Sequence, residues 1–389
     1  MRPDLLARLD VQTAHRRETG LWRHAQASET ADSPWLVRDG RRLLGFCSND
    51  YLGLARHPDL AAALKRGADE AGVGSTASAL VCGHHREHAA LEEELAAWTG
   101  RERALLFSTG YMANLGVTQA LLARGDASVQ DKLNHASLLD AAALAGAELK
   151  RYPHADVAGA RRQLASRPQA AALLATDGVF SMDGDVAPLA GLAALAAEEG
   201  ALLLVDDAHG LGVLGPQGAG CVAEAGLDAR QVPLLVGTLG KALGTAGAFV
   251  AGPAALIEGI AQFARSHVYT TAPPPALAAA TRAALRLARD DEARRQHLHA
   301  LIARFRRGAA QLGLPLSPSR TPIQPLLLGD TAAALAAAQA LEARGLLVTA
   351  IRPPTVPAGT ARLRITLSAA HDEDQVDRLL AALGEVVRA

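Results

Sequence analysis

The sequence is poor in cysteine, in excess charge and in long apolar runs. Its 389 residues include three cysteines, Cys47, Cys82 and Cys221, which are far apart and odd in number. This pattern is typical of reduced thiols in a cytoplasmic protein and argues against a disulfide framework. Basic and acidic residues nearly cancel, at 39 against 40, so the charge indicates neither a nucleic acid nor a membrane as partner.

Membrane-directed patterns are missing as well. The first 20 residues mix acids with bases and lack a continuous apolar core, so we expect no signal peptide. Alanine-rich stretches are interrupted by charge, and none reaches the roughly 20 apolar residues of a membrane span. We therefore expect a cytoplasmic protein. There is no CxxC pair, and we predict no metal site.

The length allows two domains with a substantial core. We expect an arm over 1–45, a large domain over 46–275, and a long connecting helix with a small α+β domain over 276–389. The arm should form a helix at 4–19 and a strand pair with Asp39 and Gly40 as its hairpin turn.

In the large domain, short apolar runs alternate with helical patterns, which predicts a mostly parallel sheet covered by helices on both faces. A ligand should then lie beyond the carboxyl ends of the strands. The expected helices are 58–71, 85–98, 111–122, 136–145, 156–166 and 188–199, and the expected strands are 104–107, 127–130, 171–176, 201–206, 234–238 and 248–252.

Three consecutive prolines, 273–275, mark the end of the large domain. Beyond them we expect one helical stretch over 276–312. The small domain should then contain strands at 323–328, 346–351 and 361–367, and helices at 331–344 and 372–387. A cleft between the two domains is the default position for a substrate.

Lys241 stands alone among small and apolar residues in LLVGTLGKALGTA, 234–246. A surface lysine in a glycine-rich loop is the ordinary interpretation of such a residue. However, its neighbours offer no charged, solvated face. A desolvated lysine loses its proton easily and becomes a nucleophile. Schiff-base chemistry is therefore the functional hypothesis.

Asp206, Asp207 and His209 end the expected strand 201–206 in the run VDDAHG. Adjacent strand residues point to opposite faces, so we expect one aspartate to face a ligand and the other to pair or to cap a helix. A simple turn signal is an equally good interpretation of DDAHG alone. The separation of Asp206 and His209 from Lys241 allows these three groups to meet at one sheet edge.

Ser108, Thr109 and Gly110 end one strand and open a helix, where free N–H groups favour an anion. Such a sequence is also a common helix cap. Thr238 can add a hydroxyl to the same site. A lysine, an aspartate for a ring nitrogen and a phosphate cradle are together what pyridoxal phosphate requires.

Two further positions face this sheet edge. His135 precedes the helix 136–145, where a cap is the usual role, although a ring that stacks on a flat cofactor would also suit it. The segment GVFSMDGDVAPL, 178–189, is expected to be a loop and carries Ser181, Asp183 and Asp185. We single out Ser181, because a turn that caps the following helix accounts for the two acids.

Basic residues near the C-terminus suit a carboxylate. Arg352 lies in a proline-rich loop beside Thr355, and Arg362 and Arg364 share one face of the strand 361–367. A solvated strand face is the favoured interpretation for Arg362 but not for Arg364.

Six motifs occur in order across nearly the whole chain: SNDYLGL (48–54), LEEELA (91–96), NHAS (134–137), FSMDGD (180–185), VDDAHG (205–210) and TLGKALG (238–244). Together they resemble the motifs of the α-oxoamine synthases. The resemblance implies an α/β fold of type I pyridoxal-phosphate-dependent transferases, with a seven-stranded, mostly parallel sheet between helices and a small C-terminal α+β domain. It also implies condensation of an amino acid with an acyl thioester.

The resemblance also implies residue roles. Lys241 would carry the cofactor, Asp206 would pair with its ring nitrogen, His209 would approach its ring oxygen, and His135 would stack on the ring. The other implied cofactor contacts are Gly110, Tyr111, Ser181 and Thr238, and the implied substrate contacts are Arg23, Asn49, His135, Arg352, Thr355 and Arg364.

Within the family, IRPPTVPAGTARLR most resembles the members that join L-alanine to a pimeloyl thioester, on coenzyme A or an acyl-carrier protein, in biotin synthesis. The resemblance implies a homodimer with shared sites that include Thr270 and Thr271. The alternatives are another α-oxoamine synthase, of the 2-amino-3-oxobutyrate or sphingoid-base type, and a non-catalytic partner subunit. One departure from the family is Ala79 and Leu80, where polar residues are usual.

Overall fold

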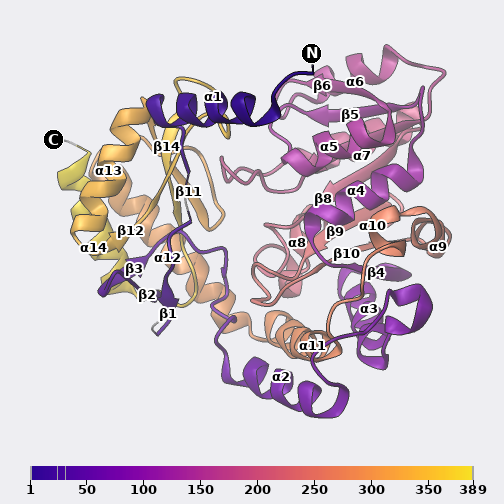
Figure 1. The fold of residues 1–389 in the computed structure, drawn as a ribbon, viewed down its shortest axis with the longest axis horizontal. Helices are drawn as coiled ribbons and strands as arrows, with labels where there is room; N and C mark the ends of the chain where they lie inside the picture. The colour runs from indigo at the N-terminus through magenta and orange to yellow at the C-terminus, as the bar shows by residue number, and fades with distance from the viewer. Residues whose placement is uncertain (1, 24, 31, 388–389) are drawn as a thin grey trace.

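The computed structural model describes residues 2–23, 25–30 and 32–387. Figure 1 shows two lobes joined by helices α11 and α12. The large lobe contains strands β4 to β10 and the helices packed on them, and the small lobe contains β1 to β3, β11 to β14 and α12 to α14.

Within the described residues, seven strands form the central sheet of the large lobe. Neighbouring strands from β9 through β8, β7 and β5 to β6 are parallel, whereas β10 runs antiparallel to both β4 and β9. The predicted mostly parallel sheet is therefore confirmed. In sheet order the strands are β4 (Arg103–Phe107), β10 (Ala248–Gly252), β9 (Leu234–Thr238), β8 (Leu202–Asp206), β7 (Ala172–Asp177), β5 (Ala127–Asp131) and β6 (Glu148–Tyr152).

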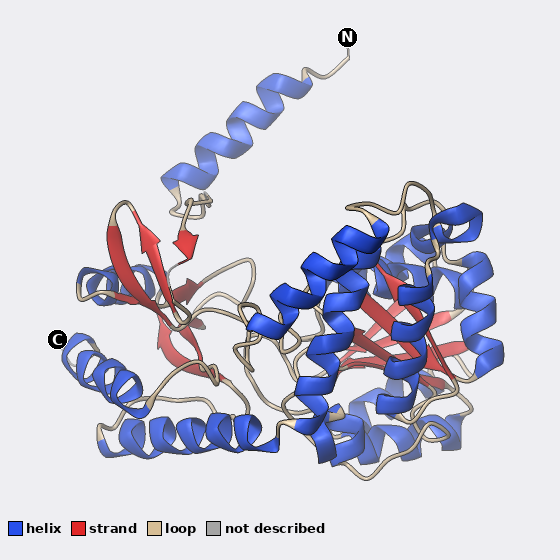
Figure 2. Cartoon of the chain, turned by 90° about the horizontal axis from the view of Figure 1, so that it is seen from below, coloured by secondary structure: helices blue, strands red, loops and turns tan. Residues whose placement is uncertain are grey.

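Apolar side chains alternate across the strands and build one hydrophobic cluster on each face. In β7, Leu173 and Ala175 join one cluster, while Leu174 joins the other. This burial on both faces is why the central strands are almost continuously apolar. Helices α4, α5 and α9 cover the first face, and helices α3, α6 and α7 cover the second. Figure 2 shows the helices packed around the sheet of the large lobe.

The predicted helices of the large lobe agree with the structure to within one residue at each end. Helices α8 to α10 were absent from the prediction. The bounds are α2 (Pro58–Ala71), α3 (Arg86–Thr99), α4 (Gly110–Leu121), α5 (Ala136–Ala145), α6 (Val157–Ala165), α7 (Leu189–Glu199), α8 (Gly220–Glu224), α9 (Ala254–Phe263), α10 (Arg265–Val268) and α11 (Pro275–Asp290), with a π-helical turn η1 (Ala79–Gly83) and a 3₁₀ turn η2 (Pro216–Gly218).

The small lobe combines two sheets with three helices among the described residues. The expected hairpin is confirmed, with Asp39 and Gly40 at positive φ values of 49° and 72°. One sheet is β1 (Glu29–Thr30), β2 (Trp35–Arg38), β3 (Arg41–Gly45) and β12 (Leu346–Leu347); the other is β11 (Ile323–Gly329), β14 (Ala361–Thr366) and β13 (Thr349–Ile351); the helices are α12 (Glu292–Gln311), α13 (Thr331–Ala343) and α14 (Glu373–Val386).

Three expectations need correction. The single helix over 276–312 is two helices, because Asp291 leaves the helical conformation and caps α12 by accepting a hydrogen bond from Arg294 N. The strand 346–351 divides between two sheets, as β12 and β13. Strand β6 was missed because it is a sheet edge with exposed polar residues and no apolar run.

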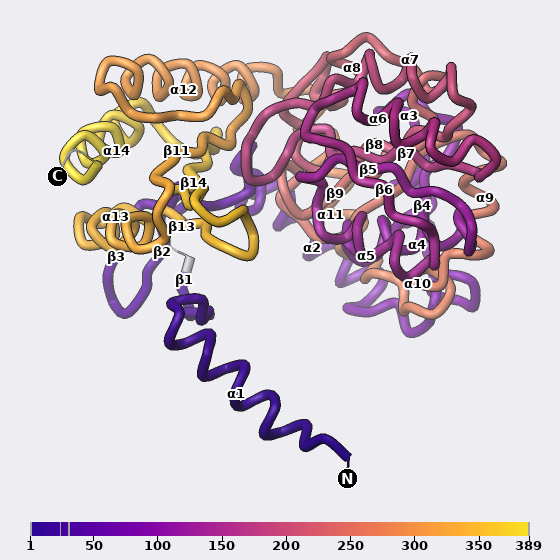
Figure 3. The backbone as a smooth tube through the Cα atoms, turned by 90° about the horizontal axis from the view of Figure 1, so that it is seen from above, coloured from indigo at the N-terminus to yellow at the C-terminus, as the bar shows by residue number. Residues whose placement is uncertain are grey.

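Helix α1 (Leu5–Glu18) points away from both lobes, and none of its residues is buried (Figure 3). The arm that follows it shares a sheet with the C-terminal part, since β3 pairs in parallel with β12. The domain boundaries at residues 45 and 275 remain a prediction. Among the described helices, none has the length and apolar character needed to cross a bilayer.

The position of a leucine in the central sheet should decide the cost of its truncation. Leu174 in β7 is fully buried, whereas Leu149 on the edge strand β6 is 37% exposed. We expect Leu174→Ala to lower the free energy of unfolding by about 2–5 kcal/mol, and Leu149→Ala by less than about 1 kcal/mol. Urea denaturation followed by circular dichroism measures both. Equal losses would contradict the assigned sheet order.

Candidate active site

The carboxyl ends of β7, β8 and β9 bring polar residues to one edge of the sheet. Asp177 and Asp206 end neighbouring strands in direct register, and both are buried. Thr238 ends β9 beside them in the sheet order. A parallel sheet presents its ligand site at this edge.

Lys241 lies in a tight turn directly after β9, as predicted. Gly244 N donates to Lys241 O at 2.8 Å, and Gly244 has a φ of 66°, a conformation that favours glycine. Burial lowers the pKa of Lys241 to about 8, although the negative charges of Asp206 and Asp177 oppose this shift. A substantial part of the amine is therefore neutral near physiological pH, as a nucleophile or base requires.

His209 contacts the lysine directly. Its Nε2 is 2.8 Å from Lys241 Nζ, and its Nδ1 is 2.7 Å from the hydroxyl of Tyr51. Burial lowers the pKa of His209 well below the ordinary value, and the positive charges of Lys241 and Arg364 add to this effect. Tyr51 belongs to the motif SNDYLGL, but the sequence alone predicted no role for this tyrosine.

The two adjacent aspartates, Asp206 and Asp207, have different hydrogen-bond partners, as expected for side chains that point to opposite faces. Asp206 accepts hydrogen bonds from the side chain of Asn114 at 2.7 Å and from Ala208 N at 3.1 Å. Asp207 instead accepts from Cys221 N at 2.7 Å near the start of α8, and burial raises its pKa to about 7. Asn114 was missed because its position on one face of α4 has no local motif.

His135 is both a helix cap and a member of the site. It caps α5, and its backbone N–H donates to the carboxylate of Asp177 at 3.1 Å. Its ring meets the ring of Tyr111 edge-on, with centroids 6.4 Å apart. The hydroxyl of Tyr111 donates to Asp140. His135 as a whole is exposed.

The start of α4 provides an open anion cradle. Thr109 accepts from Met112 N at 3.1 Å, which confirms the cap. Gly110 follows it, and apart from its chain neighbours and the backbone of its own helix, no atom of the described residues lies within 4 Å of the point where a side chain on Gly110 would begin. The hydroxyl of Thr238 accepts from Gly240 N at 3.3 Å. A phosphate at the helix N-terminus would find both free N–H groups and space.

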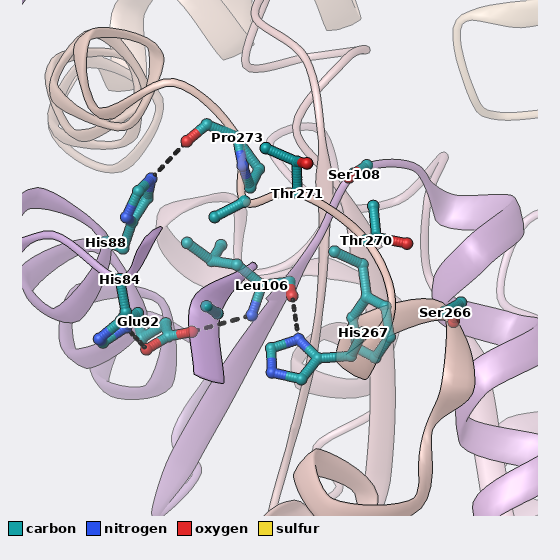
Figure 4. A pocket seen from close by; sticks show the side chains of 13 residues that line it. His84, His88, Glu92, Leu106, Ser108, Ser266, His267, Thr270, Thr271 and Pro273 are labelled. Carbon is teal, nitrogen blue, oxygen red and sulfur yellow. Dashed lines mark hydrogen bonds and ion pairs between the residues drawn. The ribbon is translucent and has the colours of Figure 1, made fainter. Parts of the chain in front are cut away.

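Thr270 and Thr271 line a pocket that Lys241 does not line. They line this pocket with Ser108 and Ser266, as shown in Figure 4. Figure 4 also shows His88 bonded to Pro273 O at 2.8 Å and Glu92 bonded to Leu106 N at 3.0 Å. Hydrogen bonds of the described residues do not connect either threonine to Lys241.

The small lobe reaches the site through two arginines of β14. Arg364 Nε donates to Ser181 O at 2.7 Å, and its two terminal nitrogens lie 3.3 Å from Asn49 Oδ1. Arg362 is 4% exposed and pairs with Asp183 at 2.5 Å. The prediction that Arg362 is solvated was therefore wrong, because the loop 178–187 packs over this strand face.

The same loop is held from the other side by His154. Its Nδ1 is 3.1 Å from Asp131 Oδ1, its Nε2 is 2.7 Å from Asp185 Oδ2, and its ring meets Phe180 edge-on. Asp183 and Asp185 thus form ion pairs and do not cap α7, contrary to expectation. His154 was missed because its partners come from two segments that are distant from it in the chain.

Arg23, Arg352 and Thr355 lie together at a second cavity, of about 500 Å³, in the small lobe. Arg23 donates to Thr355 Oγ1 at 2.7 Å. Arg352 donates to Gly20 O and Trp22 O, at 3.0 and 2.9 Å, and so anchors the arm. Cys47, two residues before Asn49, lines this cavity as well.

Comparisons with known proteins agree with this geometry. The family model described as aminotransferase class I and II matches residues 41–383. An 8-amino-7-oxononanoate synthase of Thioalkalivibrio sulfidiphilus is 58% identical over 98% of this chain and 97% of its own. The chain belongs to the 8-amino-7-oxononanoate synthase family.

Solved structures show the same fold. An 8-amino-7-oxononanoate synthase from Francisella tularensis is 31% identical, with a TM-score of 0.78 over 89% of this chain and 98% of its own. A serine palmitoyltransferase variant from S. paucimobilis with a bound PLP–myriocin aldimine is 30% identical, with a TM-score of 0.94 over 99% of both chains. The chain has the fold of type I pyridoxal-phosphate-dependent transferases and is an acyltransferase of this class.

The residues at the sheet edge fit pyridoxal phosphate. A partly neutral lysine, a buried aspartate, an exposed histidine and an open helix N-terminus are groups that suit this cofactor. In the described part of the chain, no group of three or more His, Cys, Asp or Glu could hold a metal ion.

The pair of carboxylates around His154 should make stability depend on pH. Burial lowers the pKa of His154, but the hydrogen bonds to Asp131 and Asp185 outweigh it and raise the pKa to about 10, above the ordinary 6.5. The stabilising contribution is therefore complete below about pH 6.5 and is lost as pH rises towards about 10. Denaturation midpoints should differ most between wild type and His154→Gln at pH 6.5, and least at pH 10.

Asp185→Asn is the matched partner variant, because it removes one of the two carboxylates and leaves the ring in place. It should weaken the same pH dependence. A midpoint difference that stays constant from pH 6.5 to 10 would contradict the charged clamp.

Proposed function

We propose that this enzyme condenses L-alanine with a pimeloyl thioester and forms 8-amino-7-oxononanoate, CO₂ and the free carrier thiol, as a step of biotin synthesis in the cytoplasm. Membership of the family supports this reaction. The observation that carries the substrate assignment is the presence of two cationic positions. Arg364 lies at the sheet edge, and Arg23 lies in the adjoining cavity.

Arg364 is the proposed site for the amino acid's carboxylate. Arg364 is 7% exposed, and its terminal nitrogens make long contacts, of 3.3 Å, to Asn49. A carboxylate that binds both terminal nitrogens would make shorter, charge-assisted hydrogen bonds. Ser181 O keeps Nε in place and so sets the direction of the guanidinium.

Arg23 is the proposed site for the far carboxylate of the acyl chain. One of its nitrogens donates to Thr355, which leaves further donors of the guanidinium for a ligand. Arg38 lines the same cavity, and its Nε is buried without a hydrogen-bond partner among the described residues. A plain fatty chain would leave these cations unpaired, which is unfavourable.

Different residues of the chain have different proposed roles in the reaction. Lys241 would bind the cofactor and, once alanine has replaced it, take the α-proton at Nζ. Asp206 would hold a proton on the ring nitrogen, and His135 would stack on the ring and assist acyl transfer. Ser108 to Gly110 and Thr238 would hold the phosphate. Pyridoxal phosphate, when bound, withdraws electrons from the α-carbon and so stabilises the carbanion that attacks the thioester.

A homodimer with shared sites is part of the proposal. Exposed apolar and aromatic side chains stand next in sequence to residues that line the pocket, with Leu80 beside Ala79 and Tyr269 beside Thr270. Such side chains are typical of an interface between subunits. A partner would bring Thr270 and Thr271 to the other subunit's cofactor. Other exposed apolar or aromatic residues of the large lobe are Val73, Val81, Tyr111 and Phe263. Leu80 and Val81 fall in the segment that departs from the family pattern.

Loss of the Arg23 charge should impair the acyl donor selectively. We expect Arg23→Gln to raise the KM for pimeloyl-CoA or pimeloyl carrier protein by about 10- to 100-fold, because a charged hydrogen bond is lost, with little change in the KM for alanine. Steady-state assays with pimeloyl, acetyl and palmitoyl donors measure this effect.

The control is Arg124→Gln, at an exposed position between α4 and β5. It should leave every constant unchanged. A wild-type enzyme that prefers palmitoyl-CoA, or an Arg23→Gln variant with unchanged donor preference, would contradict the assignment of the acyl substrate.

Removal of Lys241 should abolish both turnover and the visible absorption band of the bound cofactor. The reason is that Nζ is both the attachment point and the proposed base. Absorption spectra and product assays of Lys241→Ala check this outcome, and turnover near the wild-type rate would refute the role.

Mixing subunits tests the shared sites. A Thr270→Ala/Thr271→Ala variant should be impaired alone. Refolded with Lys241→Ala, it should recover up to about a quarter of wild-type activity, because half of the dimers then have one intact site. Failure to recover any activity, with dimers present, would show that each subunit builds its own site.

A further inference from the structure

Tyr51 is a buried tyrosine between the two lobes. It lies in the segment between β3 and α2, and its side chain is fully buried. Its backbone is fixed by Ala369 N, which donates to Tyr51 O at 2.8 Å. Burial raises the pKa of the phenol to about 12, so the hydroxyl keeps its proton. A protonated, immobilised hydroxyl can fix the orientation of its partners.

Hydrogen bonds form a continuous relay from Arg364 to Lys241. Arg364 donates to Asn49 Oδ1, and the Tyr51 hydroxyl donates to the same oxygen at 3.1 Å. His209 Nδ1 is 2.7 Å from the Tyr51 oxygen, and His209 Nε2 is 2.8 Å from Lys241 Nζ. The relay therefore spans the two groups proposed to bind and to deprotonate alanine.

The donors and acceptors in this relay follow from its two ends when Lys241 is charged. Guanidinium and ammonium groups have no acceptor, so Asn49 presents its carbonyl oxygen to Arg364, and His209 Nε2 accepts from Lys241. In a neutral ring the imidazole proton then lies on Nδ1, and the Tyr51 oxygen accepts it. The Tyr51 hydroxyl is left to donate to Asn49 Oδ1.

We propose that Tyr51 is a positioning residue that holds His209 in the Nδ1–H tautomer and so gives the amine of Lys241 a fixed acceptor. This inference rests on the proposed roles of Lys241 and Arg364. The ionisable groups that face the lysine are Asp206, Asp177, His209 and Arg364, and those that face His209 are Lys241, Arg364 and His135. Burial keeps His209 neutral among these cations.

Without the Tyr51 hydroxyl, the imidazole proton can move to Nε2 and point at the amine. The charged form of Lys241 then loses its acceptor, whereas the neutral form gains a donor. The change therefore favours the neutral amine and lowers the proton affinity of Lys241. Tyr51→Phe removes only this hydroxyl and keeps the packed ring.

The experiment measures the pH dependence of Lys241 acetylation in the cofactor-free protein. The sequence has four lysines, Lys65, Lys132, Lys150 and Lys241, so mass spectrometry can follow each one separately. Wild-type Lys241 should react with acetic anhydride with a midpoint near pH 8. Tyr51→Phe should lower this midpoint by about one pH unit, a tenfold loss of proton affinity.

Tyr152→Phe is the matched control. Tyr152 is also fully buried, but its hydroxyl has no hydrogen-bond partner among the described residues. It should leave the Lys241 midpoint unchanged. A Tyr51→Phe midpoint equal to that of wild type, or an equal shift in Tyr152→Phe, would overturn the proposal.

Asn49→Ala gives a second, independent test if Tyr51→Phe does not fold. Without the Asn49 acceptor, the Tyr51 hydroxyl donates to His209 Nδ1 and drives the proton to Nε2, so the midpoint should fall again. An unchanged midpoint would count against the relay. Because this measurement uses no substrate, its failure leaves the assays of the acyl donor to decide the proposed function.

Discussion

Burial of Lys241 beside Asp206 and Asp177 is the electrostatic constraint on which the rest of the site depends. A buried amine is costly when charged, and two buried carboxylates in register are costly when both are ionised. The positive charge of the amine and the negative charges of the carboxylates stabilise one another, and the pKa of Lys241 consequently lies near physiological pH. Asn114 and Ala208 satisfy the oxygens of Asp206, so this carboxylate has a fixed direction. The chemistry of the site begins with this balance.

The small lobe completes this balance from outside the central sheet. Arg362 and Arg364 project from one strand face onto the loop 178–187, where Asp183 and Ser181 O receive them. On the other side of the loop, His154 contacts Asp185 and Phe180. The loop is therefore held between the two arginines of the small lobe and His154 of the large lobe. Its position decides where the guanidinium of Arg364 can meet a carboxylate.

The sequence predicted the large lobe well because its elements are local. Buried strands are continuous apolar runs, and the helix caps Thr109 and His135 precede their helices directly. Elements that depend on their surroundings were missed or misjudged. Edge strand β6 has polar residues because it faces solvent, and β12 and β13 separate because their partners lie in two different sheets. The boundary between α11 and α12 was also missed, because it depends on one residue, Asp291, which caps α12.

The sequence by itself predicted the residues proposed to bind the cofactor, Lys241, Asp206, His209 and His135, because they follow strands or precede helices whose ends meet at one sheet edge. Only the tertiary structure decided which groups support them. Tyr51, Asn114, Asp177 and His154 come from segments that are distant in the chain, and their contacts depend on side-chain direction. Sequence spacing contains no information on such contacts. The burial of Arg362 was misjudged for the same reason, since it depends on a loop some 180 residues away.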